Sequence, residues 1–393
     1  MILNDLDFNT INHFLLRKHH LTQRSRTDDV LQAVQDIGGL HATSPMTPYL
    51  SLFARIRDFE IDDLDEELYV RKNLGKIRCM RKTIHILTKQ MMPLAYGATT
   101  AMVEKASRGY MEFRGVSPAE YERLSAEITG LLTGREMSAS EIKRLLGSEL
   151  DVSAILYLMC DQGLLVRARP QRGWKDRTQT YARFDEYFRG LDLGALSEGE
   201  AIALLVEQYL SSFGPVTEND IAWWTGLGKT KVRRALKSLQ SEVVEVNVAG
   251  VEDTMVMLRS QLDLMKEAGT PKGPTVNFLP LLDPYLMGYK ERERYLNPKH
   301  REKVFDRGGN ATSTVLLNGR VVGIWDCVED PEPVVKIFML EEPNRTTVAD
   351  IHAEAQKMGR FITGGEAEVR DCESMIPLTA RRLGNFMSPL KGC

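Results

Sequence analysis

Apolar and polar positions along the middle of the chain follow one order of elements that occurs twice. In the first copy, residues 137–146 have the apolar period of a helix, and Ser138 and Glu141 form a capping box at its start. Residues 152–161 are a second, more apolar helix. LLVRARP and TQTYARF then read as strands joined by the polar turn QRGWKDR. This order is the outline of a winged helix.

The second copy spans residues 196–258. SEGEAIALLVEQYLSSFG is a helix that ends at Gly214, VTENDIAWWTGLG is a helix capped at Thr217, and KTKVRRALKSLQSE is a third helix. VVEVNVAGVEDTMVML alternates with period two and predicts a hairpin. A weaker copy begins the chain, with helices expected over residues 7–18 and 28–37.

The pattern changes after about residue 272. TSTVLLNGRVVGIWDCV predicts two strands joined by Asn318 and Gly319, a dipeptide typical of hairpin turns, and VVKIFML predicts a third strand. Residues 346–361 have a helical pattern. We expect a separate α+β domain with a small antiparallel sheet or partial barrel.

With 393 residues, the chain is too long for one small core. We therefore predict an α+β fold of tandem winged-helix (helix-turn-helix) domains followed by a C-terminal β-barrel-like domain. The predicted domains are residues 1–125 (winged-helix-like, with the candidate site loop), 126–192 (second winged helix), 193–270 (third winged helix) and 271–393 (C-terminal domain).

Composition describes an ordinary globular protein, with 43% hydrophobic and 27% charged residues. No apolar run approaches the ~18 residues of a membrane span, and no secretory signal is visible at the N-terminus. Five scattered cysteines without a CxxC pair predict neither a zinc site nor a disulfide framework, which fits a reducing cytoplasm. Cys79 and Cys160 lie in apolar stretches, so we expect them in the core.

Charge is segregated along the chain, although the net charge is only −3. Residues 58–67 hold seven acids and no base, and residues 71–89 hold seven bases and no acid. Residues 229–237 hold five bases, and residues 167–177 hold five bases and one acid. Such blocks can form a basic surface on an acidic protein, or they can be solvated helix faces.

A winged helix can lay its last helix in a DNA major groove while the ribbon touches the backbone. The predicted DNA contacts are therefore Lys229, Lys231, Arg233, Arg234 and Lys237 on the helix, and Arg167, Arg169, Arg172, Lys175 and Arg177 on the ribbon. The alternative is that these units serve as packing or protein-contact modules. We expect Trp174, Trp223 and Trp224 to pack in the core and against the ribbon rather than to stack on bases.

The segment GGLHATSPMTPYLSLFARI, residues 38–56, joins two predicted helices. Its glycine pair ends the first helix, and Pro45 and Pro48 hold the chain out of regular structure before Tyr49. His41 and Thr43 are therefore expected on a short, stiff link. Such a link is a reasonable place for a functional group and also an ordinary place for a loop.

GLHATSPMTPYLSLFAR, CMRKTIHIL, LPLLDPYLMGYKERER and LNGRVVGIWD, together with the tandem winged helices, resemble the AlkZ/YcaQ-like family over about residues 28–340. This family consists of winged-helix bacterial DNA glycosylases, some of which excise bulky alkylated purines and unhook crosslinks. The resemblance implies a C-shaped scaffold of three winged helices held by the C-terminal domain, with DNA in the concave channel.

The family's catalytic signature is glutamine, an apolar residue, then glutamine or aspartate, directly after a glycine-leucine pair. The matching positions here are His41, Ala42 and Thr43, so both signature residues differ. An alkylated purine is already a good leaving group, and the enzyme mainly orients a water. Neutral His41 can accept a proton from that water, worth about 10²–10⁴-fold, and Thr43 can hold it. Activity should then rise in one step near pH ~6.5. The alternative is a buried loop histidine and a turn threonine.

Alternation in CMRKTIHIL predicts a half-buried strand with Arg81 and His85 on one face. By resemblance this strand lines the DNA channel, so Arg81 and His85 are both predicted DNA contacts, and Arg81 holds a phosphate beside an extruded nucleotide. The alternative is a salt bridge from Arg81 to the acids of residues 58–67.

We therefore predict a monomeric, cytoplasmic DNA-repair protein that binds double-stranded DNA and hydrolyses the N-glycosidic bond of alkylated purines as a monofunctional glycosylase. The alternative is a winged-helix DNA-binding protein, a regulator or damage sensor, without catalysis. No metal or organic cofactor is expected, because HExxH, P-loop and GxGxxG motifs are missing from the sequence. No membrane association or obligate protein partner is expected.

Overall fold

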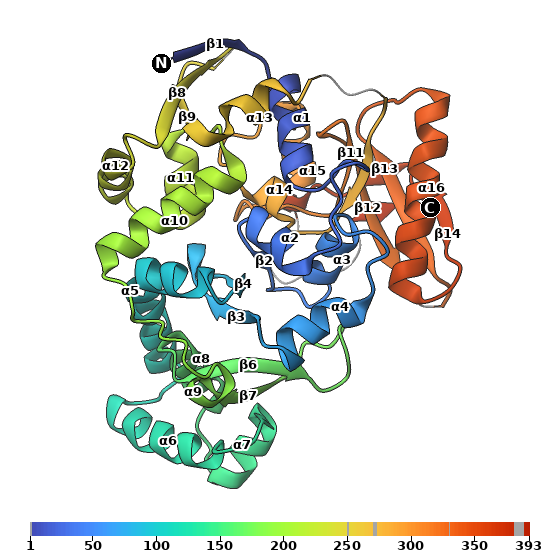
Figure 1. Cartoon of the computed structure of the whole chain (residues 1–393). Helices are drawn as coiled ribbons and strands as arrows, with labels where there is room; N and C mark the ends of the chain where they lie inside the picture. The colour runs from blue at the N-terminus through green and yellow to red at the C-terminus, as the bar shows by residue number, and fades with distance from the viewer. Residues whose placement is uncertain (1, 250, 270–272, 330, 381–388) are drawn as a thin grey trace.

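The computed structural model describes residues 2–249, 251–269, 273–329, 331–380 and 389–393, and it is an α+β structure (Figure 1). Its helices are α1 (Phe8–Lys18), α2 (Val30–Asp36), α3 (Thr47–Phe53), α4 (Ile61–Asp65), α5 (Met91–Phe113), α6 (Pro118–Leu131), α7 (Ala139–Leu146), α8 (Val152–Asp161), α9 (Phe184–Tyr187), α10 (Glu198–Phe213), α11 (Glu218–Thr225), α12 (Lys229–Ser238), α13 (Leu262–Lys266), α14 (Pro284–Met287), α15 (Arg301–Val304) and α16 (Arg345–Thr363).

The strands form five small sheets within the described residues. They are β1 (Ile2–Leu6), β8 (Val243–Val248) and β9 (Met255–Leu258); β2 (Leu40–His41), β4 (Ile84–Thr88) and β3 (Leu74–Arg78); β5 (Met137–Ser138), β7 (Gln179–Arg183) and β6 (Leu165–Pro170); β10 (Val276–Leu279), β11 (Thr314–Leu317), β12 (Arg320–Val328), β13 (Val334–Met339) and β14 (Glu368–Asp371); and β15 (Ser374–Met375) and β16 (Leu390–Lys391).

The first predicted helix–hairpin unit is confirmed. Ser138 caps α7, and the Glu141 carboxylate accepts a hydrogen bond of 2.7 Å from the Ser138 N–H, as the capping box requires. α8 has the predicted bounds, and β6 pairs with β7 as an antiparallel ribbon. α6, α7 and α8 bury a small core of their own, so this part of the chain packs largely against itself.

The second helix–hairpin unit is also confirmed, with one addition that the sequence did not predict. α10 ends at Phe213, α11 is capped by Thr217, α12 follows, and β8 and β9 form the hairpin. The N-terminal strand β1 pairs in parallel with β8, so the start of the chain completes this sheet. Helices α1 and α2 lie where the weaker first copy was expected.

The C-terminal region differs from the expected barrel. β10 to β14 form a sheet in sequence order, and its edge strands β10 and β14 do not pair with each other within the described residues. One face is covered by α16, whose Ile351 and Met358 are buried in the same core as Val335 and Ile337 of β13. The sheet is therefore open, with α16 packed on one of its faces. The pair β13–β14 is parallel, whereas the other pairs are antiparallel as predicted.

The hairpin turn between β11 and β12 is confirmed. Asn318 and Gly319 both have positive φ, 51° and 79°, which is the backbone of a tight two-residue turn. A Cβ at position 319 would lie 2.7 Å from the Tyr285 hydroxyl oxygen, so this position also needs glycine for space.

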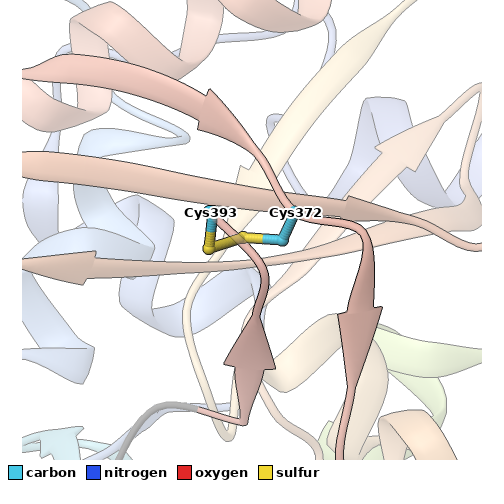
Figure 2. The surroundings of a disulfide bond; sticks show 2 residues. All are labelled: Cys372 and Cys393. Carbon is cyan, nitrogen blue, oxygen red and sulfur yellow. A yellow bond between two sulfur atoms is a disulfide. The ribbon is translucent and has the colours of Figure 1, made fainter.

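The expectation of no disulfide is wrong. Cys372 and Cys393 form a disulfide with an S–S distance of 2.18 Å, shown in Figure 2. Pairing of β15 with β16 brings the two ends of this segment together, and the Cα atoms lie 4.5 Å apart. Cysteine usage therefore does not support a reducing compartment. Cys79 and Cys160 are buried, as predicted.

Two other expectations relate to the chain as a whole. The predicted domain boundary at residues 270/271 lies outside the described residues. Among the described helices, none has the length and apolar composition needed to cross a membrane.

Candidate nucleic-acid site

Helix α2 ends at a glycine pair that begins the candidate site. Gly38 and Gly39 have φ of 72° and 97°, and their N–H groups donate to the carbonyls of Gln35 (3.2 Å) and Val34 (2.9 Å). A Cβ at position 39 would lie 2.4 Å from the Leu87 side chain, so only glycine fits there without displacing it.

His41 lies on a strand, which corrects the expected link. Leu40 and His41 form β2, which pairs with β4 so that His41 lies opposite His85. A strand of two residues has no periodicity of its own, so only the distant partner reveals it. Pro48 is not in irregular structure either, because it lies in the first turn of α3, where its missing N–H costs no hydrogen bond.

The strand over CMRKTIHIL is shorter than predicted. Residues Met80–Lys82 form a 3-10 turn, and Arg81 and Lys82 have positive φ of 52° and 60°. β4 therefore begins only at Ile84, and Arg81 does not share a strand face with His85. The alternating apolar residues suggested one continuous strand, but the segment consists of a turn followed by a strand.

His41 and His85 form a buried pair on one face of the β2-β4-β3 sheet. His41 is 4% exposed, and the two ring centroids lie 4.9 Å apart. The Nδ1 atom of His85 lies 3.2 Å from the Thr83 carbonyl oxygen. The Nδ1 atom of His41 is buried and has no hydrogen-bond partner among the described residues. An unpaired buried polar atom is unusual and costs about 1–3 kcal/mol.

Burial keeps both imidazoles neutral at pH 7. Burial lowers the pKa of His41 well below its ordinary value, and the nearby His85 and Arg81 lower it further. The pKa of His85 falls to about 4, again chiefly through burial. Any step in activity that reports His41 is therefore expected well below the pH ~6.5 of an ordinary histidine.

Arg81 stacks on Trp223 of α11. Its guanidinium carbon lies 3.8 Å from the indole centroid, and Nη2 donates a long hydrogen bond of 3.4 Å to the Gly308 carbonyl. Arg292 approaches the same indole at 5.5 Å. Burial and the charge of Arg292 lower the pKa of Arg81 to about 10.

No ion pair joins Arg81 to residues 58–67 within the part of the chain that the structure describes, so the salt-bridge alternative for Arg81 is wrong. Trp224 is buried in the core, and Trp174 packs against Tyr49 and Phe361 at 5.3 and 5.8 Å, as expected for packing residues. Trp223 is partly buried against the core, as expected, and its ring also contacts the Arg81 guanidinium.

Thr43 lines a cavity of about 140 Å³. The cavity lies where the residues after β2, strands β3 and β4, and the β6–β7 connection meet. Its lining includes Ala42, Thr43, Tyr49, Tyr69, Lys76, Ile84, Ile86, Trp174, Asp176 and Arg177. His41 is not part of the lining. The structure therefore brings Thr43 to the cavity and leaves His41 in the sheet.

A hydrogen-bonded cluster that the sequence analysis missed surrounds this cavity. The Tyr49 hydroxyl donates to an Asp65 carboxylate oxygen at 2.6 Å, and Lys76 Nζ donates to the Tyr69 hydroxyl at 2.6 Å. Burial lowers the pKa of Lys76 to about 8, although Asp65 opposes the shift. The available signal was a lysine between the apolar residues Leu74 and Ile77 in the strand LGKIR of β3.

The predicted contacts on α12 are at the surface. Val232 and Ala235 bury one side of the helix, and the five basic side chains Lys229, Lys231, Arg233, Arg234 and Lys237 are exposed. Lys231 forms an ion pair with Glu198 at 2.7 Å, and Arg233 forms one with Glu218 at 2.8 Å. The other three have no carboxylate partner among the described residues.

On the β6–β7 hairpin (residues 165–183), Arg167 is not at the surface where a phosphate contact was expected. It is 4% exposed, and its guanidinium lies 5.9 Å from the Tyr157 ring centroid. β6 is buried on both faces over its first four residues, and this draws Arg167 inward. Arg169 is exposed, but it lies over the Tyr69 ring at 4.9 Å and 3.9 Å from an Asp65 oxygen.

The tip of the same hairpin holds the other three predicted contacts. Arg172 pairs with Asp176 of its own turn at 3.4 Å, and Lys175 pairs with Glu329 of the C-terminal region at 2.5 Å. Arg177 is exposed and lines the cavity. Among the described residues, no group of three or more histidine, cysteine, aspartate or glutamate side chains is placed to hold a metal ion.

Comparison with known proteins gives consistent matches. The family model described as DNA glycosylase AlkZ-like matches residues 34–361. A curated interstrand DNA cross-link repair glycosylase from Streptomyces sahachiroi is 29% identical over 306 residues, which cover 73% of this chain and 79% of that protein. The solved structure of the Streptomyces sahachiroi DNA glycosylase AlkZ superposes with a TM-score of 0.74 at 21% identity, covering 93% of this chain and 100% of that chain.

Proposed function

Because this chain belongs to the AlkZ-like DNA glycosylase family, we propose that it binds duplex DNA and releases damaged bases by hydrolysing their N-glycosidic bond. The substrates we propose are alkylated purines, including those within the interstrand cross-links that the curated relative's name specifies. The observation that carries the proposal is the cavity beside Thr43, at the position of the family's catalytic signature.

We further propose that the helix–hairpin units within residues 1–125, 126–192 and 193–270 act as winged helices around the DNA, held by residues 271–393. In this arrangement α12 lies on the phosphate backbone, and Arg81 holds a phosphate near the candidate site. We also propose that it acts as a monomer in the cytoplasm, a location that the proposed DNA substrate supports and the cysteines do not.

The size of the cavity indicates which part of a nucleotide enters it. Pockets for drug-sized ligands have about 300–1,000 Å³, whereas this cavity has about 140 Å³. We therefore place the sugar of an extruded nucleotide in the cavity and leave the bulky alkylated base at its mouth. Extrusion costs a few kcal/mol of unstacking and is easiest for a damaged base, which favours lesions over normal nucleotides.

Hydrolysis then needs a positioned water more than a strong acid, because a cationic alkylated purine leaves as a neutral base. In this proposal the hydroxyl of Thr43, which lines the cavity, holds this water. We assign proton acceptance to His41, whose buried ring is neutral and has an unpaired Nδ1 atom. His41 does not line the cavity, so the proton has to reach its ring from the water at Thr43 through a relay, and the two roles are separable by mutation.

The test uses duplex DNA that contains N7-methylguanine or an alkyl cross-link and measures released base and unhooked strands. We expect release by the wild-type protein and a loss of about tenfold or more in Thr43→Ala, with DNA affinity within about threefold. His41→Gln, which introduces the family's residue, should retain more activity than His41→Ala. Tight DNA binding without release from either substrate at any pH would leave only the non-catalytic alternative.

The pH profile separates the two assigned roles. Since burial lowers the pKa of His41, its ring stays neutral as the pH falls from about 8 to about 6. If His41 is the base, the rate should be flat over that range and should fall only when the pH passes below the lowered pKa. A single step near pH 6.5 would mean that an ordinary, exposed histidine or another group controls the rate.

A further inference from the structure

The cavity beside Thr43 contains an amine that base hydrolysis does not use. Lys76 comes from β3, where its neighbours Gly75 and Ile77 face the opposite side of the sheet, and it lines the cavity together with Thr43 and Tyr69. Its Nζ donates to the Tyr69 hydroxyl at 2.6 Å, and this hydrogen bond fixes the amine at the cavity wall.

The surroundings favour a reactive amine over a structural ammonium ion. No carboxylate lies within ion-pair distance of Lys76 in the part of the chain that the structure describes. Burial lowers the pKa of Lys76 to about 8, so a substantial part of the lysine is a neutral amine near physiological pH. Lysine is the side chain that becomes a nucleophile toward carbonyl carbons when it is desolvated in this way.

Base release places a carbonyl compound next to this amine. Hydrolysis leaves an abasic deoxyribose, whose ring opens to an aldehyde at C1′, and the cavity is of a size for a sugar rather than a nucleotide. We propose that Lys76 attacks this aldehyde, so that the protein carries a DNA lyase activity in addition to base hydrolysis. The inference rests on the proposed function, which supplies the abasic sugar and positions it.

The reaction balances without a cofactor. The Nζ lone pair forms the bond to C1′, the carbonyl oxygen takes up two protons and leaves as water, and an imine results. A water then removes a proton from C2′, the C2′–C3′ double bond forms, and the C3′–O bond breaks, with the electron pair leaving on the 3′-phosphate. Hydrolysis of the imine frees Lys76. The activity expected for this chain is therefore not limited to base release, which revises the monofunctional prediction.

The experiment uses duplex DNA with a preformed abasic site, made from uracil by a separate glycosylase, so that it does not depend on base release by this protein. Sodium borohydride reduces an imine to a stable amine and joins protein to DNA, which a denaturing gel detects. We expect the wild-type protein to be trapped on the DNA and, without borohydride, to cut the strand at the abasic site.

Three variants locate the reacting amine. Lys76→Met and Lys76→Arg should reduce trapping and strand cleavage at least about 100-fold, because neither side chain forms an imine. Lys76→Arg keeps the positive charge, so it controls for lost electrostatics and folding, which circular dichroism checks. Lys82→Met removes an exposed lysine from the neighbouring turn and should leave trapping unchanged.

Each outcome decides the proposal. Absence of wild-type trapping, wild-type trapping levels in Lys76→Arg, or a cross-link that peptide mapping places on another residue overturns it. Trapping at Lys76 by a protein that releases no base from alkylated DNA supports the lyase and refutes the proposed glycosylase. Base release without trapping supports the proposed glycosylase and overturns the lyase.

Discussion

Helix α12 and the β6–β7 hairpin each contain five basic residues in a short stretch of chain, within residues 229–237 and 167–177. On α12 all five are exposed, and three have no carboxylate partner among the described residues. In the hairpin, Arg167 is buried, and Arg172 and Lys175 are engaged in ion pairs. Equal numbers of charges in the sequence therefore lead to different surfaces.

The difference follows from what each element packs against. α12 is an outer helix at the left edge of the molecule in Figure 1, and it buries only one side, through Val232 and Ala235. The hairpin passes beneath the β2-β4-β3 sheet and reaches the C-terminal region, where Trp174 packs against Phe361 and Lys175 meets Glu329. A helix on the outside keeps its charges at the surface, where we propose that they meet DNA, whereas a hairpin between two regions uses them for internal contacts.

The largest expected effect tests the DNA-binding half of this comparison. DNA affinity falls with salt, and the slope of log affinity against log salt concentration measures this fall. Replacing Lys229, Arg234 and Lys237 by alanine should make that slope shallower by about 2.7. At 0.1 M salt this corresponds to about 500-fold weaker binding, if affinity at 1 M salt is unaffected. Fluorescence anisotropy across a salt series measures both quantities. An unchanged slope would mean that α12 does not face DNA.

The next largest effect is expected at Arg167, the buried arginine of the hairpin. Burial raises the pKa of Asp161, while a hydrogen bond from Ser107 and the charges of Arg167 and Arg78 oppose that shift. Arg167→Met removes one of these two cations, and we expect a loss of about 2 kcal/mol in the free energy of unfolding, less than for an unpaired buried charge because Arg78 remains at 3.0 Å. Urea denaturation measures it.

Arg169→Met is the matched control for that loss, because Arg169 lies two residues away on the same strand and is exposed. It should change stability by no more than about 0.5 kcal/mol. Equal losses in the two variants, or a flattened salt slope in Arg167→Met, would contradict the assignment of Arg167 to the interior.

The same comparison shows what the sequence could predict. The helices and hairpins were predicted to within a few residues, although α12 ends at Ser238 rather than at Glu242. Their signals are local: the capping box at Ser138, the Thr217 cap, and the Asn318–Gly319 turn all act within a few residues. Solvent exposure is different, because it depends on which element packs against which. Arg167 and Lys229 have equally basic neighbourhoods in the sequence, and only the packing distinguishes them.

The candidate site was predicted in part for the same reason. The resemblance located Thr43, and the structure places it at the cavity. The pairing of His41 with His85 and the Cys372–Cys393 disulfide join residues far apart in the chain, and no local pattern reveals them. Lys76 was missed because one lysine in a strand is usually a solvent-facing residue, and its direction depends on the sheet around it.

A smaller effect is expected from the tip of the hairpin. Arg172→Ala combined with Lys175→Ala should change DNA affinity by about threefold or less and the salt slope by less than one, because both side chains already neutralise carboxylates of the protein. The measurement is the same salt series. A slope that flattens by about two would show that both side chains leave their partners to bind phosphate, and the contrast with α12 would then be wrong.

The smallest effect isolates the contact between the hairpin and the C-terminal region. Lys175 and Glu329 are both partly exposed, so water screens their attraction, and a double-mutant cycle with Lys175→Met and Glu329→Gln should give a coupling of about 0.5 kcal/mol. This coupling should decrease in high salt, whereas the packing of Trp174 on Phe361 should not. A coupling above about 2 kcal/mol that resists salt would mean that the ion pair is shielded from water and holds the hairpin in place. In that case the charge of Lys175 would hold the hairpin to the C-terminal region and would not be available to DNA. The hairpin and α12 would then differ more than their exposed fractions indicate.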